Sequence, residues 1–463
     1  MTVDRPVGPG PDGWDADIHP FPSGWPAPTR RLATQRWLVD AVIRQVGVDW
    51  DQGRTRYIGN AGGTDAEVDF GQARERIAKL ADIERVFATL GMRRERLADA
   101  AIAAGHDVTA RKHAFIASLL WGAAEWTFFV SPEQVRRAET ANRHKLRCYD
   151  LWMGRAPHPV RRIRVPYGRG SLSGVLHLPP GVTGPVPCVL HVGGMDSFKE
   201  HAVLMSGDRY LDRGIARFLV DLPGQGEAVL EGAFIGRTNM VEAGLAALEV
   251  LRQQPDIDGT RLGITGVSFG SWWATQIAAH APGLEGTAVW AVVHEAGLES
   301  IFEQVSPTFK ARFMAMAGYV DEDAFDAFAR RWTLADDAPR VTHPYLVIAG
   351  EDDELSPIGH TYRLVDRVAG PRELVVYRGE RHSIGGGPAA RLGPNAMDLA
   401  ADWFADRFAG RDTTERVTVV DVTGHEATEP LAPWLADAIA RTDATLDDLS
   451  GARGRASGQA AGA

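Results

Sequence analysis

Hydrophobic and polar residues follow two different periods along the chain, and the change falls near Pro159. Between about residues 32 and 155, apolar residues recur every three or four positions, as in "QRWLVDAVIRQV" and "ARKHAFIASLLWGAAEWTFFV". This spacing is typical of helices that pack one face on a core. After Pro159, short apolar runs predict strands, and segments such as "MVEAGLAALEVLRQQ" predict helices between them. The pattern therefore predicts a helical region followed by a region of alternating strands and helices.

Most of the predicted strands are short, continuous apolar runs. They read "RRIRVPY", "LSGVLHL", "PVPCVLHVGG", "IARFLVDLPG", "RLGITGVS", "TAVWAVVHEAG", "PYLVIAGEDD" and "RELVVYRGE". The first two, joined by "GRGS", predict a strand pair. The others, separated by helices, predict an α/β fold with a mostly parallel sheet covered on both faces. Ligands of such sheets gather at the carboxyl ends of the strands.

These patterns divide the 463 residues into four parts. The predicted parts are an irregular leader rich in Pro and Gly (1–30), a helical cap domain (31–155), an α/β domain (156–410) and a C-terminal extension with a disordered end (411–463). The extension contains strand-like "RVTVVDV" and helix-like "PWLADAIART", which the pattern alone does not place.

Composition and charge exclude several classes of protein. Apolar residues make up 44% and charged residues 24% of the chain, as in ordinary folded domains. The formal net charge of −10, without a block of Lys and Arg, argues against nucleic acid or a membrane surface as partner. Cys148 and Cys188 lack the spacing of a metal site or a disulfide framework. With no signal-peptide pattern and no long apolar stretch, we expect a cytoplasmic protein.

The stretch "GITGVSFGSWW" places Ser268 in a GxSxG pattern. The pentapeptide alone is a moderate signal in a glycine-rich chain. Here it follows a predicted strand and precedes a predicted helix, which is the context of a nucleophile elbow. Gly266 and Gly270 have a steric reason to be there, because a sharp turn brings neighbouring backbone too close for a Cβ. Ser268 is therefore a candidate nucleophile.

A serine nucleophile needs a base, and the base needs a third group that orients it. The loop after the strand "PYLVIAG" reads "EDDELSP", and the loop after "RELVVY" contains His382. The order of serine, acid and histidine matches an α/β-hydrolase. We predict Asp353 as the acid, with Asp352 as the alternative, because Gly350 and Pro357 are placed as in the acid loop of that fold.

Acyl transfer also needs hydrogen-bond donors where negative charge develops on the attacked carbonyl oxygen. One expected donor is the backbone N–H of Phe269. The other is expected in the loop "GGMDSFKEH", from Met195 or, alternatively, Gly194.

The stretches "HVGGMDSFKEH", "RGIARFLVDLPGQGE" and "RLGITGVSFGS", preceded by a helical region, resemble the dihydroxypseudooxynicotine hydrolases. They are similar also to fungal hydrolases that shorten polyketide pigments and to fermentation–respiration-switch esterase-like proteins. The resemblance covers about residues 30–410. It implies an α/β-hydrolase core under an N-terminal helical cap, with the substrate pocket where the two meet.

The resemblance implies a reaction class as well. Such enzymes cleave a carbon–carbon bond beside a ketone, or an ester. They are expected to place an acidic residue beyond the strand that follows the nucleophile helix, and "VVHEAGLES" offers Glu295 and Glu299, of which we favour Glu295. Asp196, Trp126 and Trp272 are further candidates for substrate contacts, although aromatic residues at helical spacing more often lie in a core.

The sequence therefore predicts a cofactor-independent serine hydrolase of a small carbonyl substrate. Carbon–carbon hydrolysis of a β-diketone, polyketide or aromatic compound is placed ahead of ester hydrolysis. Acyl transfer, cyclisation, peptide cleavage and a non-catalytic ligand receptor stay open. No metal cluster, phosphate loop or dinucleotide fingerprint is found, and the resemblance implies a homodimer.

Overall fold

The computed structural model describes residues 28–125, 132–201 and 209–444. The first part is helical, as the spacing predicted. Its elements are α1 (Arg30–Val46), η1 (Val48–Trp50), α2 (Arg54–Ala61), α3 (Gly63–Arg76), η2 (Leu80–Asp82), α4 (Ile83–Ala103), α5 (Asp107–Glu125) and α6 (Pro132–Met153). None of the helices in the described ranges combines the length and apolar character needed to cross a bilayer.

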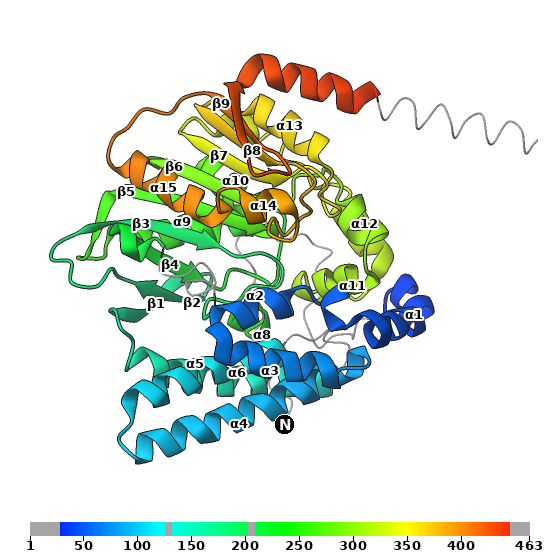
Figure 1. The fold of residues 1–463 in the computed structure, drawn as a ribbon, viewed down its shortest axis with the longest axis vertical. Helices are drawn as coiled ribbons and strands as arrows, with labels where there is room; N and C mark the ends of the chain where they lie inside the picture. Colours follow the sequence, from blue (N-terminus) through cyan, green and yellow to red (C-terminus); the bar gives the residue numbers. More distant parts are fainter. Residues whose placement is uncertain (1–27, 126–131, 202–208, 445–463) are drawn as a thin grey trace, which may run out of the picture.

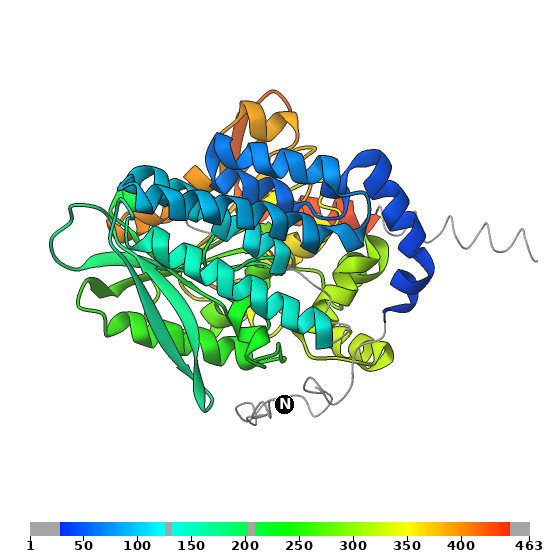
Figure 2. The ribbon, with the colours of Figure 1, turned by 90° about the horizontal axis from the view of Figure 1, so that it is seen from below.

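Helices α2 to α6 gather on one side of the molecule and form a cap (Figure 1). Side chains such as Phe70, Phe87 and Leu120 bury themselves in a hydrophobic cluster that belongs mainly to these helices. Seen from below, the cap helices lie across the α/β domain (Figure 2). The cap thus has a hydrophobic core of its own and packs against the α/β domain.

One sheet of ten strands organises the remainder of the described chain. Its strand order is β1-β2-β4-β3-β5-β6-β7-β8-β9-β10. Neighbouring strands from β4 to β9 in this order are parallel. The pairs β1–β2, β2–β4 and β9–β10 are antiparallel. The strands are β1 (Val160–Tyr167), β2 (Gly170–His177), β3 (Val186–Val192), β4 (Ala216–Val220), β5 (Ile257–Ser268), β6 (Gly286–Val292), β7 (Tyr345–Gly350), β8 (Arg372–Tyr377), β9 (Arg416–Val420) and β10 (Glu426–Pro430).

Helices cover both faces of the sheet, which explains why strands β3, β4, β6 and β7 are buried along their whole length. Side chains of α9 and α10 pack on one face in the largest hydrophobic cluster. Trp403 and Phe404 of α15 pack on the other. The helices of this part are η3 (Leu211–Arg213), α8 (Gly226–Leu230), α9 (Asn239–Arg252), α10 (Phe269–His280), η4 (Ser300–Gln304), α11 (Pro307–Met316), α12 (Glu322–Ala329), η5 (Ala338–Arg340), α13 (Ile358–Arg367), α14 (Pro388–Leu392) and α15 (Ala396–Phe408).

The sheet continues past residue 410, where the sequence pattern placed the end of the α/β domain. Strand β9 pairs in parallel with β8, and β10 follows it as an antiparallel hairpin. The helix over residues 431–444 buries Leu431 and Leu435 in the cluster that α9 and α10 share. Residues 416–444 therefore pack as part of the α/β domain.

This packing predicts that Leu435→Ala lowers the free energy of unfolding by about 2–5 kcal/mol, because it removes a buried side chain from the core. Asp437→Ala, on the exposed side of the same helix, is the matched control and should change stability by less than about 0.5 kcal/mol. Denaturant unfolding measures both. Equal stability of the two variants would mean that this helix does not belong to the folded core.

Candidate active site

Ser268 lies at a sharp turn between the end of β5 and the first residue of α10. Its backbone has φ 55° and ψ −130°, and a residue other than glycine in such a conformation costs on the order of 1–3 kcal/mol. A Cβ on Gly266 would overlap the carbonyl oxygen of Gly270, and a Cβ on Gly270 would overlap that of Val192. Both glycines are therefore required for the turn that holds Ser268 at the end of β5.

His382 joins Ser268 to Asp353 through two hydrogen bonds. Its Nε2 lies 2.9 Å from Ser268 Oγ, and its Nδ1 lies 2.8 Å from Asp353 Oδ2. The second carboxylate oxygen of Asp353 accepts the backbone N–H groups of Leu355 at 2.8 Å and Ser356 at 3.0 Å. The three side chains come from the ends of β5, β7 and β8, and they meet because parallel strands end at one edge of the sheet.

The acidic loop after β7 offers several carboxylates, and Asp353 is the one that contacts His382. Its side chain is fully buried, whereas Asp352 is exposed and donates its backbone N–H to the carbonyl of Glu380 at 2.9 Å. Glu354 accepts the backbone N–H of His382 at 3.1 Å. The neighbours of Asp353 thus hold the acid loop and the histidine loop together.

The surroundings of His382 favour its protonated form. Burial acts to lower the pKa of His382, but the negative charge of Asp353 and its hydrogen bond outweigh burial and raise the pKa above the ordinary value. The carboxylates of Glu354 and Asp196 act in the same direction. An imidazole in this setting can accept the Ser268 proton and be stabilised as a cation afterwards.

The loop that carries Gly194 and Met195 passes directly beside Ser268. A Cβ on Gly194 would lie 2.9 Å from Ser268 Cβ and 3.4 Å from its Oγ. The side-chain amide of Gln225 donates to the carbonyls of Gly193 at 2.8 Å and Gly194 at 2.9 Å. Because a trans peptide points its N–H opposite to its carbonyl, Gln225 turns the N–H groups of Gly194 and Met195 away from itself.

Phe269, the residue after Ser268, is the first residue of α10. The N–H groups of a first helical turn have no partner inside the helix and carry the positive end of its dipole. The ring of Phe269 is fully buried and lies 4.6 Å from that of Phe313. Core packing therefore holds this peptide beside the serine.

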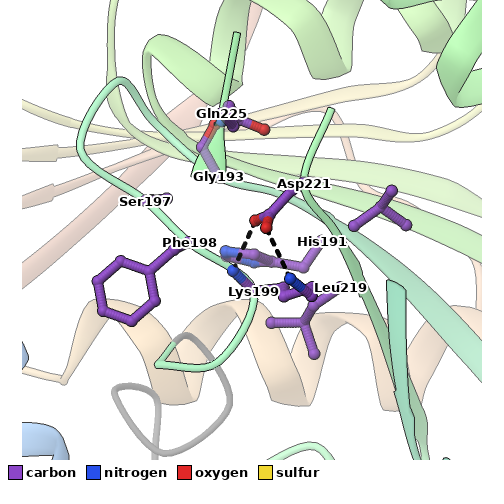
Figure 3. A pocket seen from close by; sticks show the side chains of 9 residues that line it. His191, Gly193, Ser197, Phe198, Lys199, Leu219, Asp221 and Gln225 are labelled. Atoms are coloured by element: carbon purple, nitrogen blue, oxygen red, sulfur yellow. Dashed lines mark hydrogen bonds and ion pairs between the residues drawn. The ribbon is translucent and has the colours of Figure 1, made fainter. Parts of the chain in front are cut away.

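The rear of the same loop is anchored by charge (Figure 3). Lys199 donates to Asp221 through both its backbone N and its Nζ, each at 2.8 Å, and its Nζ also contacts Glu227. A small cavity lies at this anchor, lined by His191, Gly193, Ser197, Phe198, Lys199, Leu219, Val220, Asp221 and Gln225.

Asp196 lies in this loop near buried groups of the cap. Tyr57 of α2 donates its hydroxyl to Asp196 Oδ2 at 3.4 Å. Arg54 of α2 and Arg312 of α11 are buried, and burial lowers the pKa of each to about 10, although Asp196 counteracts it. Asp196 therefore sits where cap and α/β domain meet and where charge is concentrated.

The other predicted substrate contacts lie in different surroundings. The buried carboxylate of Glu295 accepts hydrogen bonds from the backbone N–H of Ser300 at 2.7 Å and from its hydroxyl at 3.0 Å. These bonds stabilise the turn between residues 295 and 300. Glu299 is exposed. Trp272 is buried in the core, and its ring lies 5.6 Å from that of Trp332. Trp126 lies outside the described residues.

Sequence reasoning assigned no role to Gln225 or Lys199, although both stand in stretches that it singled out. Gln225 is the central residue of "GQG", and Lys199 belongs to "SFKE". A polar residue inside such a loop motif indicates a possible structural or functional role. Its partners, however, lie 22 to 32 residues away in the chain. Only the folded chain brings them together.

The strand order and the turn at Ser268 define an α/β-hydrolase fold. The sequence model of the family described as "Esterase FrsA-like" matches residues 87–324, just over half of the chain. The chain belongs to this FrsA-like esterase family.

Individual relatives match shorter regions. Esterase FrsA from Enterobacter sp. (strain 638) is 32% identical, over 30% of this chain and 33% of its own length. The 2,6-dihydropseudooxynicotine hydrolase of Paenarthrobacter nicotinovorans is 29% identical, over 42% of this chain and 51% of its own. The chain therefore aligns with about a third to a half of the length of each of these relatives.

A solved structure supports the fold over a longer range. The crystal structure of a 2,6-dihydroxy-pseudo-oxynicotine hydrolase superposes with a TM-score of 0.64 at 22% identity, covering 77% of this chain and 96% of that one. The predicted α/β-hydrolase fold with a helical region before it is confirmed.

The geometry around His382 predicts a titration that can be measured directly. NMR should give a pKa for His382 above about 6.5, the ordinary value for histidine. Asp353→Asn should lower the pKa of His382, because it removes the adjacent negative charge. Asp352→Asn, next to it but exposed, should leave it unchanged.

The resonance can be identified among the 14 histidines by its loss in His382→Asn. A pKa that responds equally to both Asn variants would contradict the pairing of His382 with Asp353.

Proposed function

We propose that this protein is a serine hydrolase in which Ser268, His382 and Asp353 act as nucleophile, general base and orienting acid. The observation that carries the proposal is the pair of hydrogen bonds at 2.9 Å and 2.8 Å that link these three side chains. The strained turn at Ser268 supports it, because such strain persists only where surrounding structure enforces it.

In the proposed reaction, Ser268 Oγ attacks a substrate carbonyl while His382 Nε2 takes its proton. The tetrahedral intermediate then collapses, His382 donates the proton to the leaving group, and an acyl-enzyme remains. Water, activated by His382, releases the acyl group. Asp353 keeps the Nδ1 proton in place and stabilises the imidazolium at each stage.

The negative charge on the intermediate is proposed to be stabilised by the N–H groups of Phe269 and of Met195 or Gly194. Each such donor is worth about 3–4 kcal/mol of transition-state stabilisation. The position of Gly194 beside Ser268 and the carbonyls that Gln225 holds favour this assignment.

The proposed substrate is a small carbonyl compound, cleaved at a carbon–carbon bond of a β-diketone-like, polyketide or aromatic molecule. The similarity to a 2,6-dihydropseudooxynicotine hydrolase supports this choice, as does the sequence resemblance to carbon–carbon hydrolases. Ester hydrolysis is the second candidate, favoured by membership of an esterase-like family. Both reactions use the same three residues and differ in the leaving group.

A fluorophosphonate probe tests the nucleophile. Wild-type protein should be labelled covalently, and Ser268→Ala should abolish labelling because no other group receives the phosphorus. His382→Ala should slow labelling by at least about a thousandfold, since the serine then lacks its base. Mass spectrometry measures the extent and site of labelling.

Ser271→Ala, three residues further along, is the matched control and should still be labelled. Well-folded wild-type protein that stays unlabelled would favour a ligand receptor over an enzyme. Turnover of a panel of β-diketones and aryl esters, each compared with Ser268→Ala, then separates the two substrate classes.

Gln225→Ala should lower the rate constant for acylation by about 10- to 100-fold, because two peptide carbonyls lose the donor that orients them and a displaced oxyanion donor loses much of its effect. KM should change little. Stopped-flow measurement with p-nitrophenyl acetate gives the rate.

Gln276→Ala is the control, since this amide lies on α10 and contacts Asp337 at 3.4 Å. If Gln225→Ala acylates as fast as wild type, the amide has no part in arranging the loop.

A further inference from the structure

The loop over residues 193–201 contacts both the α/β domain and the cap. Its front, Gly193 to Met195, lies beside Ser268, as described above. Its rear, from Phe198 to His201, is buried and reaches into the cap. Because Phe198 follows Met195 by only three residues, the front and the rear of the loop are closely connected along the chain.

Phe198 is packed as if it were a cap residue. It belongs to the hydrophobic cluster of the cap helices. Its ring lies over Gly122 of α5, so closely that a Cβ on Gly122 would overlap three of its ring atoms. The absence of a side chain at residue 122 thus forms the hole that receives the loop.

A buried row of charges runs beside this contact. Lys145 of α6 is fully buried, and its Nζ lies 2.6 Å from Glu125 Oε2 of α5 and 3.7 Å from Glu200 Oε2 of the loop. The other oxygen of Glu200 lies 2.9 Å from Lys199 Nζ. Glu200 therefore links a cap lysine to the lysine that is anchored on Asp221.

These charges tie the loop to the cap in one arrangement. Buried ions are tolerated only when each has a partner, and removal of one partner leaves an uncompensated charge. The ammonium of Lys145 also lies 5.0 Å from the centre of the Phe198 ring, within range of a cation–π interaction. Charge and shape therefore select the same position of the loop.

We propose that Lys145 and the Gly122–Phe198 contact are positioning elements for the oxyanion donors, so that cap helices α5 and α6 set the acylation rate. The proposal rests on the hydrolase function proposed above. The reason for the effect is geometric, because a misplacement of about 1 Å at a catalytic group can cost about a hundredfold in rate.

The test uses p-nitrophenyl acetate, a small ester, so that altered substrate contacts with the cap do not dominate the result. Lys145→Met and Gly122→Ala should each lower the acylation rate constant 10- to 100-fold, with KM changed less than about threefold. Arg147→Met is the matched control on the same helix, because Arg147 pairs with Glu95 and Asp99 inside the cap. It should stay within twofold of wild type.

A compensating pair separates positioning from a general loss of stability. Phe198→Leu shortens the side chain that fills the hole, and Gly122→Ala partly fills the hole itself. The double variant should recover at least fivefold of the rate that Gly122→Ala loses. All rates are measured at a temperature where circular dichroism shows each variant folded, and the pair still decides the matter if Lys145→Met does not fold.

The outcomes distinguish the two proposals. Wild-type rates in folded Lys145→Met and Gly122→Ala, losses confined to KM, or no recovery in the double variant would overturn the positioning role while labelling of Ser268 stands. If wild type and Ser268→Ala release p-nitrophenol at the same rate and neither is labelled by the fluorophosphonate, the hydrolase proposal fails and this inference falls with it.

Discussion

The close approach of three backbone segments around Ser268 is the constraint on which the site depends. Strand β3 passes so near to the start of α10 that residue 270 has no room for a side chain, and residue 266 is restricted in the same way by the turn itself. The packing of β5 and α10 in the hydrophobic core holds Ser268 at a positive φ. Large apolar burial elsewhere thus stabilises a local conformation that is unfavourable by itself.

Much of the fold followed from periodicity, because parallel strands covered on both faces are apolar throughout and their helices are amphipathic. The GxSxG pattern and the polar loops after two predicted strands indicated Ser268, Asp353 and His382 as candidates. Periodicity could not place β9, whose partner β8 is known only once the sheet is assembled. It also could not separate Trp272 as core from Trp272 as a substrate contact, because both roles need the same apolar ring.

Residues that act through partners far away in the chain could not be predicted from the sequence, for a different reason. Gln225 contacts carbonyls of Gly193 and Gly194 about thirty residues away. Gly122 is distinguished from other glycines only by the Phe198 ring that packs against it. The space above Gly122 is recognised only once Phe198 is seen to fill it. Local propensity carries no information about such pairs, whereas the strand ends of an α/β sheet converge whatever their side chains are.

The loop over residues 193–201 shows how rigidity is distributed between the two parts of the molecule. Gln225 holds its front by two neutral hydrogen bonds, and Lys199 holds its rear by buried ion pairs to Asp221 and Glu227. A preorganised donor stabilises developing charge because it does not have to reorient during the reaction. Because the protein's own side chains hold the loop at both ends, the fold itself fixes its position.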